Sequence, residues 1–225
     1  MGKRLDRRPD RRNECQRTLL AQKAARFIRD HGIKDFRTAK SKAAMALGMS
    51  NYGALPSNRE IETALAEYNR IFDVHTHTGL LEHLRQVAIE VMRELRPFRP
   101  CLVGSVLSGN VTEYSNINLH VYSDSPESVG MRLDACGFQY RLRQRNHRIQ
   151  RDMPEAFSGY DFWVEGSAIE LTVFPERRKG HAPLSPIDGR PMQRARINAV
   201  ETLLRDRLAG PDDCGWVQEN SLRAD

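Results

Sequence analysis

The sequence predicts an α+β protein in which a helical N-terminal region precedes a mixed β-sheet flanked by helices. Two observations predict this class. As far as residue 95, apolar residues recur every three or four positions, the spacing of amphipathic helices. From residue 101 they form short runs rich in Val, Ile, Leu and Tyr, which are typical of strands. Because the pattern changes near residues 73–79, we assign 13–78 to the helical region and 79–210 to the α+β domain.

Four helices are expected before the sheet. Asp35 is a suitable N-cap residue, and Gly32 is of the type that commonly ends a preceding helix. Ser57 and Glu60 have the spacing of a capping box, in which each side chain bonds the other residue's backbone N–H. The turn between the first two helices also permits a helix-turn-helix, although the second helix carries no distinctive base-reading residues. The expected helices cover residues 14–31, 35–48, 57–72 and 79–95.

The remaining chain alternates strand and helix signals. Glu165-Gly166-Ser167 marks a hairpin turn, and a proline-rich stretch over 175–191 leads to the last helix. Residues 211–225 are expected to form a loose tail. Strands are expected at 101–107, 116–122, 137–145, 160–165 and 168–174, and helices at 126–136 and 192–208.

Composition excludes several classes of protein. No apolar run approaches the roughly 20 residues that a membrane helix needs, and no apolar segment follows the basic N-terminus as in a secretory signal. None of the four cysteines forms a C-x-x-C pair, so neither a zinc knuckle nor a redox motif is indicated. We therefore expect a protein of the reducing, cytoplasmic compartment with no membrane partner.

Positive charge is concentrated in two segments. Residues 1–12 hold +4 of the net +6 and lack apolar periodicity, so we expect a disordered basic arm. Such an arm can contact the phosphates of RNA or DNA, or it can act as a solubilising tail. The second segment contains Arg141, Arg143 and Arg145, which share one face if 137–145 is a strand. This arginine strand suits phosphate or nucleic acid; the alternative is an edge strand kept soluble by charge.

One ordered set of motifs suggests a family. An amphipathic helix precedes a strand that ends in Gly104-Ser105; the next strand carries Asn116-Ile117-Asn118, and a later strand carries Glu170. Over roughly residues 80–175 this order resembles the core motif of the nucleotidyltransferase (polymerase β-like) superfamily. The resemblance implies that Asn116, Asn118 and Glu170 converge as catalytic and metal-binding positions for Mg²⁺. It also implies an NTP whose phosphate oxygens contact Gly104, Ser105 and Ser108.

The sequence departs from the family pattern at the metal-binding strand. The family has two carboxylates where this chain has the amides of Asn116 and Asn118. An amide oxygen can ligate a hard cation but is neutral, so two of three negative charges are missing. His120, on the same strand face, is either a replacement ligand or a core histidine.

Two further motifs have alternative interpretations. Asp73-Val74-His75-Thr76-His77-Thr78 matches a metal signature of PHP-type phosphoesterases, but it follows a helix, and we expect an exposed interhelix loop without metal. The loop 182–191 carries Arg190 beside other basic residues. It either holds a phosphate at the mouth of the site or serves as a structural connector.

Two functions follow from these observations. The first is a nucleotidyltransferase-fold protein that binds a nucleotide or nucleic-acid phosphate, with a degraded metal site and weak or absent catalysis. The alternative is an active Mg²⁺-dependent enzyme that moves an NMP from an NTP to an RNA, protein or small-molecule hydroxyl. The amides at Asn116 and Asn118 favour binding, whereas Gly104-Ser105 and Glu170 keep the enzyme in consideration.

Overall fold

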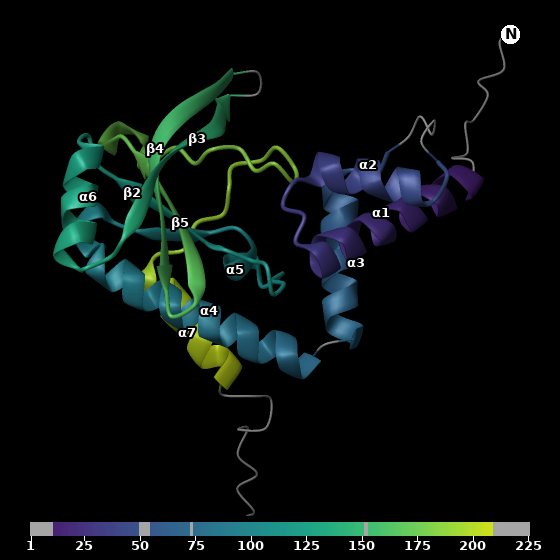
Figure 1. The fold of residues 1–225 in the computed structure, drawn as a ribbon, viewed down its shortest axis with the longest axis horizontal. Coiled ribbons are helices and arrows are strands. Elements are labelled where there is room, and N and C mark those ends of the chain that lie inside the picture. Colours follow the sequence, from purple (N-terminus) through teal and green to yellow (C-terminus); the bar gives the residue numbers. More distant parts are fainter. Residues whose placement is uncertain (1–10, 50–54, 73, 151–152, 209–225) are drawn as a thin grey trace, which may run out of the picture.

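The computed structural model describes residues 11–49, 55–72, 74–150 and 153–208. It has the α+β class that the sequence predicts: N-terminal helices lie beside a five-stranded mixed sheet with its own helices (Figure 1). None of the helices in these residues has the length and apolar content that a membrane crossing requires.

The helical region consists of α1 (Arg11–His31), α2 (Phe36–Ala46) and α3 (Asn58–Phe72). Both predicted caps are confirmed. The Asp35 carboxylate accepts the backbone N–H of Thr38 at 2.8 Å. Glu60 accepts the N–H of Ser57 at 2.7 Å, and Ser57 Oγ accepts the N–H of Glu60 at 3.2 Å. The three helices enclose a core of Leu20, Ala21, Ala24, Ala25, Ala39, Ala43, Ala44, Ile61 and Leu65.

The sheet domain follows α4 (Val74–Glu94) and a 3₁₀ turn at Arg96–Phe98. The strand order is β1-β2-β5-β4-β3, and only β2 and β5 are parallel. At the outer edge of β1, the backbone of Leu102 forms an antiparallel bridge with the backbone of Ala195. The remaining elements are β1 (Cys101–Val103), α5 (Ser105–Ser108), β2 (Ile117–Tyr122), α6 (Pro126–Ala135), β3 (Tyr140–Gln150), β4 (Met153–Val164), β5 (Ser167–Phe174), a 3₁₀ turn (Glu176–Arg178) and α7 (Ile197–Leu208).

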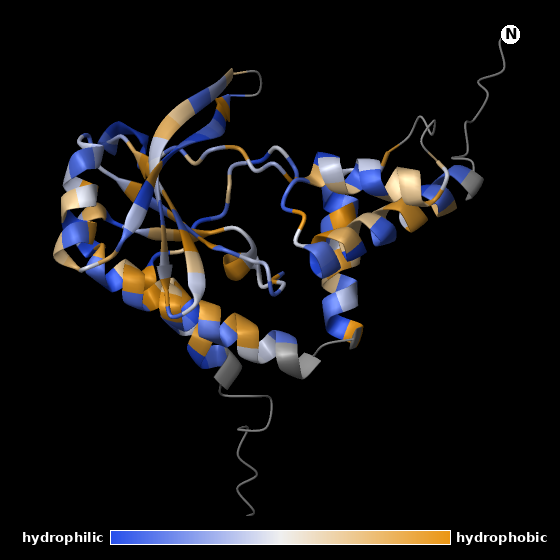
Figure 2. Cartoon of the chain, viewed as in Figure 1, coloured by the Kyte–Doolittle hydropathy of each residue, from blue (hydrophilic) through white to orange (hydrophobic). Residues whose placement is uncertain are grey.

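Strand alternation gives the sheet two different faces. Leu119, Leu171 and Phe162 lie on the face that packs against α4, α6 and α7, within one apolar core. Hydrophobic residues follow the part of α4 that runs beside the sheet (Figure 2). Asn118 and Glu170, paired across β2 and β5, lie on the opposite face, which we call the open face. Around Asn118 and Glu170 the open face brings polar side chains from different strands together, while farther along the strands it carries the buried cluster of Tyr122, Phe157 and Phe174.

The prediction of an interhelix loop at 73–78 is wrong for residues 74–78, which are helical. α4 begins at Val74, so His75 and His77 lie in its first turn, and Asp73 lies outside the described residues. No Pro or Gly interrupts the chain between Val74 and Gly79, and a single Gly is tolerated inside a helix. The apolar pattern predicted too short a helix, because the residues of the first turn of α4 do not belong to its apolar stripe.

Several other boundaries differ from the expectation. The strand expected at 101–107 stops at Val103, because Gly104 has φ +75° and turns the chain into α5. The last helix begins at Ile197 instead of 192. α1 begins at Arg11, so the last two residues of the expected basic arm are helical. Residues 1–10 of that arm and the tail 211–225 lie outside the described residues.

Candidate functional site

The motif residues of β1, β2 and β5 meet in one cavity. Gly104, Ser105, Asn116, Asn118 and Glu170 all line a cavity of about 520 Å³, which we call the smaller cavity. Its opposite wall comes from the helical region and the 175–196 loop, through Ile28, Ile33, Lys34, Phe36, Glu62, Leu65, Pro186 and Met192. The site therefore lies between the open face of the sheet and the N-terminal helices.

Strand register produces this convergence. Asn118 pairs with Val103 in antiparallel β1 and with Glu170 in parallel β5. Gly104 follows Val103, and a Cβ built on Gly104 would lie 3.5 Å from the Asn118 amide nitrogen. The predicted grouping of Asn116, Asn118 and Glu170 is present, because the amide of Asn116 donates a hydrogen bond to Glu170 Oε1.

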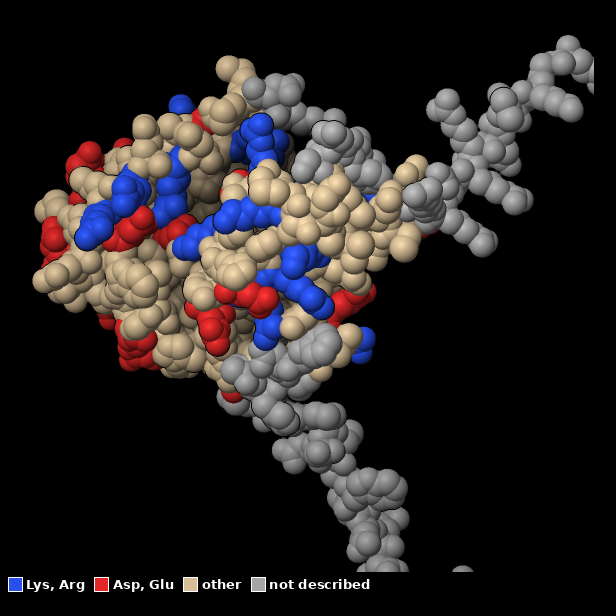
Figure 3. Space-filling view, turned by 45° about the vertical axis from the view of Figure 1, so that its right-hand side comes forward, with Lys and Arg blue, Asp and Glu red and all other residues tan. Residues whose placement is uncertain are grey.

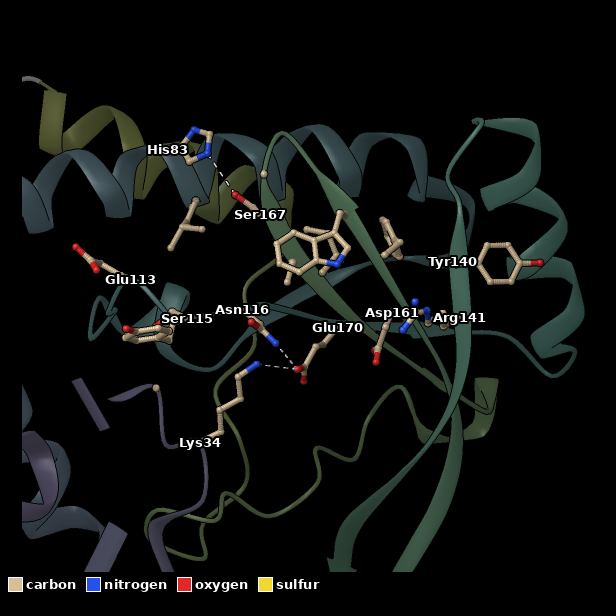
Figure 4. Close-up of a pocket in the computed structure, with 18 of the residues that line it drawn as sticks. Lys34, His83, Glu113, Ser115, Asn116, Tyr140, Arg141, Asp161, Ser167 and Glu170 are labelled. Carbon is tan, nitrogen blue, oxygen red and sulfur yellow. Dashed lines mark hydrogen bonds and ion pairs between the residues drawn. The ribbon is translucent and has the colours of Figure 1, made fainter. Parts of the chain in front are cut away.

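Glu170 is held by cationic side chains from two distant parts of the chain. Arg145 Nη1 on β3 donates to Glu170 Oε2 at 3.0 Å. Lys34 Nζ, from the loop between α1 and α2, lies 3.6 Å from Glu170 Oε1. Lys34 and Asn116 both point at the Glu170 carboxylate (Figure 4). Its negative charge is thus matched by protein cations.

The arginine strand has acidic partners that sequence proximity does not reveal. Arg145 forms an ion pair with Asp161 as well as with Glu170, and Arg143 Nε lies 3.4 Å from Asp161 Oδ2. In the part of the chain that the structure describes, Arg141 makes no ion pair. Arg141 is therefore the member of the series whose guanidinium is available to a ligand.

His120 is buried in the wall of the smaller cavity. Its side chain is 2% exposed and its ring lies 4.7 Å from Phe174 and 5.4 Å from His147, centroid to centroid. Burial, followed by the repulsion of His147 and Arg194, lowers its pKa to about 3, so the imidazole is neutral. Among the described residues its Nδ1 has no hydrogen-bond partner. Burial and nearby Arg145 lower the pKa of His147 to about 4, and its Nε2 lies 3.3 Å from Thr172 Oγ1.

Sequence reasoning missed the residues that the helical region contributes. Glu62 on α3 lines the smaller cavity, and burial raises the pKa of its carboxyl. Asn110 donates hydrogen bonds to the Glu62 backbone oxygen, at 3.1 Å, and to its carboxylate. Nothing in the spacing of Lys34, Glu62 or Asn110 identifies them as site residues, since their grouping arises from the packing of the helical region against the sheet.

Two predicted phosphate-binding residues lie outside the cavity lining. Ser108 is exposed at the end of α5, where its hydroxyl bonds the Ser105 carbonyl oxygen at 3.3 Å. Arg190 is exposed in the 182–191 loop, which is an ordered hairpin-like turn bridged between Leu184 and Pro191. This loop contacts α3, since Asn58 Nδ2 donates to the Pro186 carbonyl oxygen at 2.6 Å.

A second, larger cavity adjoins the first. It measures about 890 Å³ and shares Lys34, Asn116 and Glu170 with the smaller cavity (Figure 4). Its own lining includes Arg141, Asp161 and Trp163 from the β3–β4 hairpin. Lys and Arg side chains gather with some carboxylates around the hollow where the sheet domain meets the helical region (Figure 3).

The donor set of the smaller cavity does not suit a pair of Mg²⁺ ions. Magnesium prefers carboxylate and water oxygens in octahedral geometry. Here Glu170 is already opposed by Arg145 and Lys34, and the other two motif positions are amides. Within the described residues, no cluster of three or more His, Cys, Asp or Glu side chains is arranged to hold a metal ion.

No protein-family model, curated protein or solved structure matches the chain. Functional inference therefore depends on the side chains of the two cavities. The nucleotidyltransferase assignment stays a prediction, supported by the convergence of its motif residues.

Proposed function

We propose that the chain is a nucleotidyltransferase-fold protein that binds a nucleotide without metal and with little or no turnover. The supporting observation is that Gly104-Ser105, the two asparagines and Glu170 share one cavity while Lys34 and Arg145 neutralise the carboxylate. In the family that the sequence resembles, metal ions supply the positive charge at this place. In this chain the Lys34 ammonium and the Arg145 guanidinium supply that positive charge.

The nucleotide phosphates have a defined set of donors in this proposal. A Lys ammonium carries three N–H donors, and in the structure one side of Lys34 faces Glu170 while its side chain remains 62% exposed. Ser105 offers a hydroxyl in the smaller cavity, and Arg141, which makes no ion pair among the described residues, offers a guanidinium in the adjoining larger cavity. Glu170 then orients the cations instead of ligating a metal. Binding is consequently independent of Mg²⁺.

The first prediction is that ATP binds equally well in Mg²⁺ and in EDTA, as measured by calorimetry. Lys34→Met should weaken ATP binding about tenfold, the effect of losing one charge-assisted hydrogen bond. Lys42→Met is the matched control, because Lys42 is exposed on α2 and lines neither cavity. Equal losses in the two variants would contradict a specific role for Lys34.

The second prediction concerns the amides. Asn116→Asp combined with Asn118→Asp should create measurable Mg²⁺ affinity, because three carboxylates would then face the cavity. In EDTA the same double variant should have a lower melting temperature than the wild type, since like charges crowd one site. Robust Mg²⁺-dependent NTP turnover by the wild type, abolished by Glu170→Gln, would overturn the proposal in favour of an active transferase.

A further inference from the structure

The two most exposed aromatic side chains both line the larger cavity, and Tyr114 also lines the smaller one. Among the Phe, Tyr and Trp residues whose side chains the structure describes, only Tyr114 and Trp163 are exposed, at 47% and 71%. Both line the larger cavity, although one belongs to the loop before β2 and the other to β4. Large apolar groups left exposed in a concave site are a common sign of ligand binding. Tyr114 packs against Gly32 of the helical region, whereas Trp163, at 71% exposed, is the stronger candidate for a ligand contact.

The strand register leaves space beside the Trp163 ring. Trp163 pairs with Ala168 on β5, and both lie on the open face with Asp161 and Glu170. On the other side of Ala168 lies β2. Because Ile169 pairs with Ile117, the residues just before them, Ala168 and Asn116, lie next to each other. A methyl group thus forms the floor between the indole and the Asn116 amide. A flat ring can lie over this floor with one face against Trp163.

The distance from this space to the smaller cavity matches a nucleotide. From Trp163 on β4, the sheet crosses β5 at Ala168 to reach β2, and Asn118 lies two residues farther along β2. Two strand spacings and two residue rises correspond to about 12 Å between the Trp163 and Asn118 Cα atoms. Lys34, Asn116 and Glu170 line both cavities, so the two are continuous. A group stacked on Trp163 can therefore be joined by a ribose to phosphates that reach Lys34 and Ser105.

We propose that the larger cavity is a nucleobase site in which the base stacks on Trp163, with Tyr114 closing the side nearest the helical region. This inference rests on the proposed nucleotide binding and specifies the ligand: a nucleoside phosphate is bound, and a phosphosugar or free polyphosphate lacks the group that fills the larger cavity. Stacking on Trp is tolerant of base identity, because every base has a π-face.

The test compares ATP, adenosine and inorganic tripolyphosphate on wild type and on Trp163→Leu. The variant should bind ATP about 5- to 150-fold more weakly, the range found for loss of one base–aromatic stack, and should bind tripolyphosphate as wild type does. Leu142→Ala is the matched control: Leu142 is 69% exposed on the same hairpin but lies on the other face of β3. It should bind all three ligands as wild type does.

Fluorescence separates the two proposals. In a Trp216→Phe background, which leaves Trp163 as the one indole, adenosine and ATP should change the emission and tripolyphosphate should not. If ATP and tripolyphosphate bind wild type equally and Trp163→Leu affects neither, the base site is refuted while phosphate binding stands. If adenosine perturbs Trp163 and tripolyphosphate does not bind, the base site stands and the phosphate site fails. If no ligand binds, both proposals are overturned.

Discussion

His120 is a buried histidine whose protonation destabilises the fold. Its pKa is about 3 in the folded chain against an ordinary value of 6.5. Below pH 6.5 the unfolded chain therefore takes up a proton that the folded chain does not, and stability falls as pH decreases toward 3. The decline approaches about 1.4 kcal/mol per pH unit for such a group. His147, with a pKa of about 4, acts in the same direction.

The third prediction is that His120→Phe flattens this decline between pH 6.5 and 4.5. Phe fits the aromatic surroundings of His120 and cannot be protonated. The free energy of unfolding, from urea titrations at several pH values, checks the expectation. Glu60, whose pKa is lowered to about 2 by its partners Arg17 and Ser57 against burial, loses its stabilising contribution mainly as the pH falls below its ordinary value of 4.5, outside this window.

A histidine elsewhere provides the control for that experiment. His181 is exposed in the loop after β5, so His181→Gln should keep the wild-type pH profile. Parallel profiles for wild type and His120→Phe would show that the buried imidazole does not govern acid stability.

At the scale of secondary-structure elements, the sequence predicted what depends on neighbouring residues. The Asp35 cap, the Ser57–Glu60 capping box and the turn at Glu165-Gly166 are all local, and each is present. The ion pairs of Arg145 could not be foreseen, because Asp161 and Glu170 belong to other strands. Only the register of three strands brings these side chains together.

β4 contains a glycine that allows Arg145 to reach across the sheet. Gly159 pairs with Arg143 and with Thr172, and the Arg145 side chain passes over it. A Cβ on Gly159 would lie 2.7 Å from the Leu171 carbonyl oxygen and 3.1 Å from Arg145 Nε. The missing side chain is thus a condition for the Arg145–Glu170 ion pair.

The fourth prediction is that Gly159→Ala destabilises the protein by about 1–3 kcal/mol, the usual cost of overpacking a fitted site. Because Arg145 must move, ATP binding should weaken as well. Unfolding free energy and calorimetry measure the two effects. Gly180→Ala serves as control, since a Cβ there meets nothing within 4 Å. Wild-type stability in Gly159→Ala would show that the backbone adjusts freely at β4.

At the scale of the whole molecule, polar contacts join the helical core to the main core of the sheet. The helical core and the sheet core share no member among the described residues. Between them, Asn69 Nδ2 donates to Asn110 Oδ1 at 3.3 Å and to the Val111 carbonyl oxygen at 3.1 Å. Asn110 in turn bonds Glu62, and Lys34 reaches Glu170. Sequence predicts each core from apolar spacing but cannot predict the polar contacts between the cores.

The fifth prediction tests this junction with Asn110→Ala. Burial raises the pKa of the Glu62 carboxyl, and the hydrogen bond from Asn110 lowers it. The variant removes that hydrogen bond. Leaving a buried acceptor unsatisfied costs about 1–3 kcal/mol. The lost bond stabilises the ionised carboxylate, so the penalty should be largest above the pKa of Glu62. It should shrink as pH falls and the carboxyl takes up a proton.

Urea unfolding at pH 7 and pH 5 measures that dependence, with Asn198→Ala, exposed on α7, as the control. A penalty equal at both pH values would mean that Asn110 acts by packing and not through the Glu62 charge. The junction also bears on ligand binding, because Glu62 and Lys34 line the smaller cavity from the helical side. A nucleotide held between the two cores should therefore stabilise both, and ATP should raise the melting temperature of Asn110→Ala as well as that of wild type.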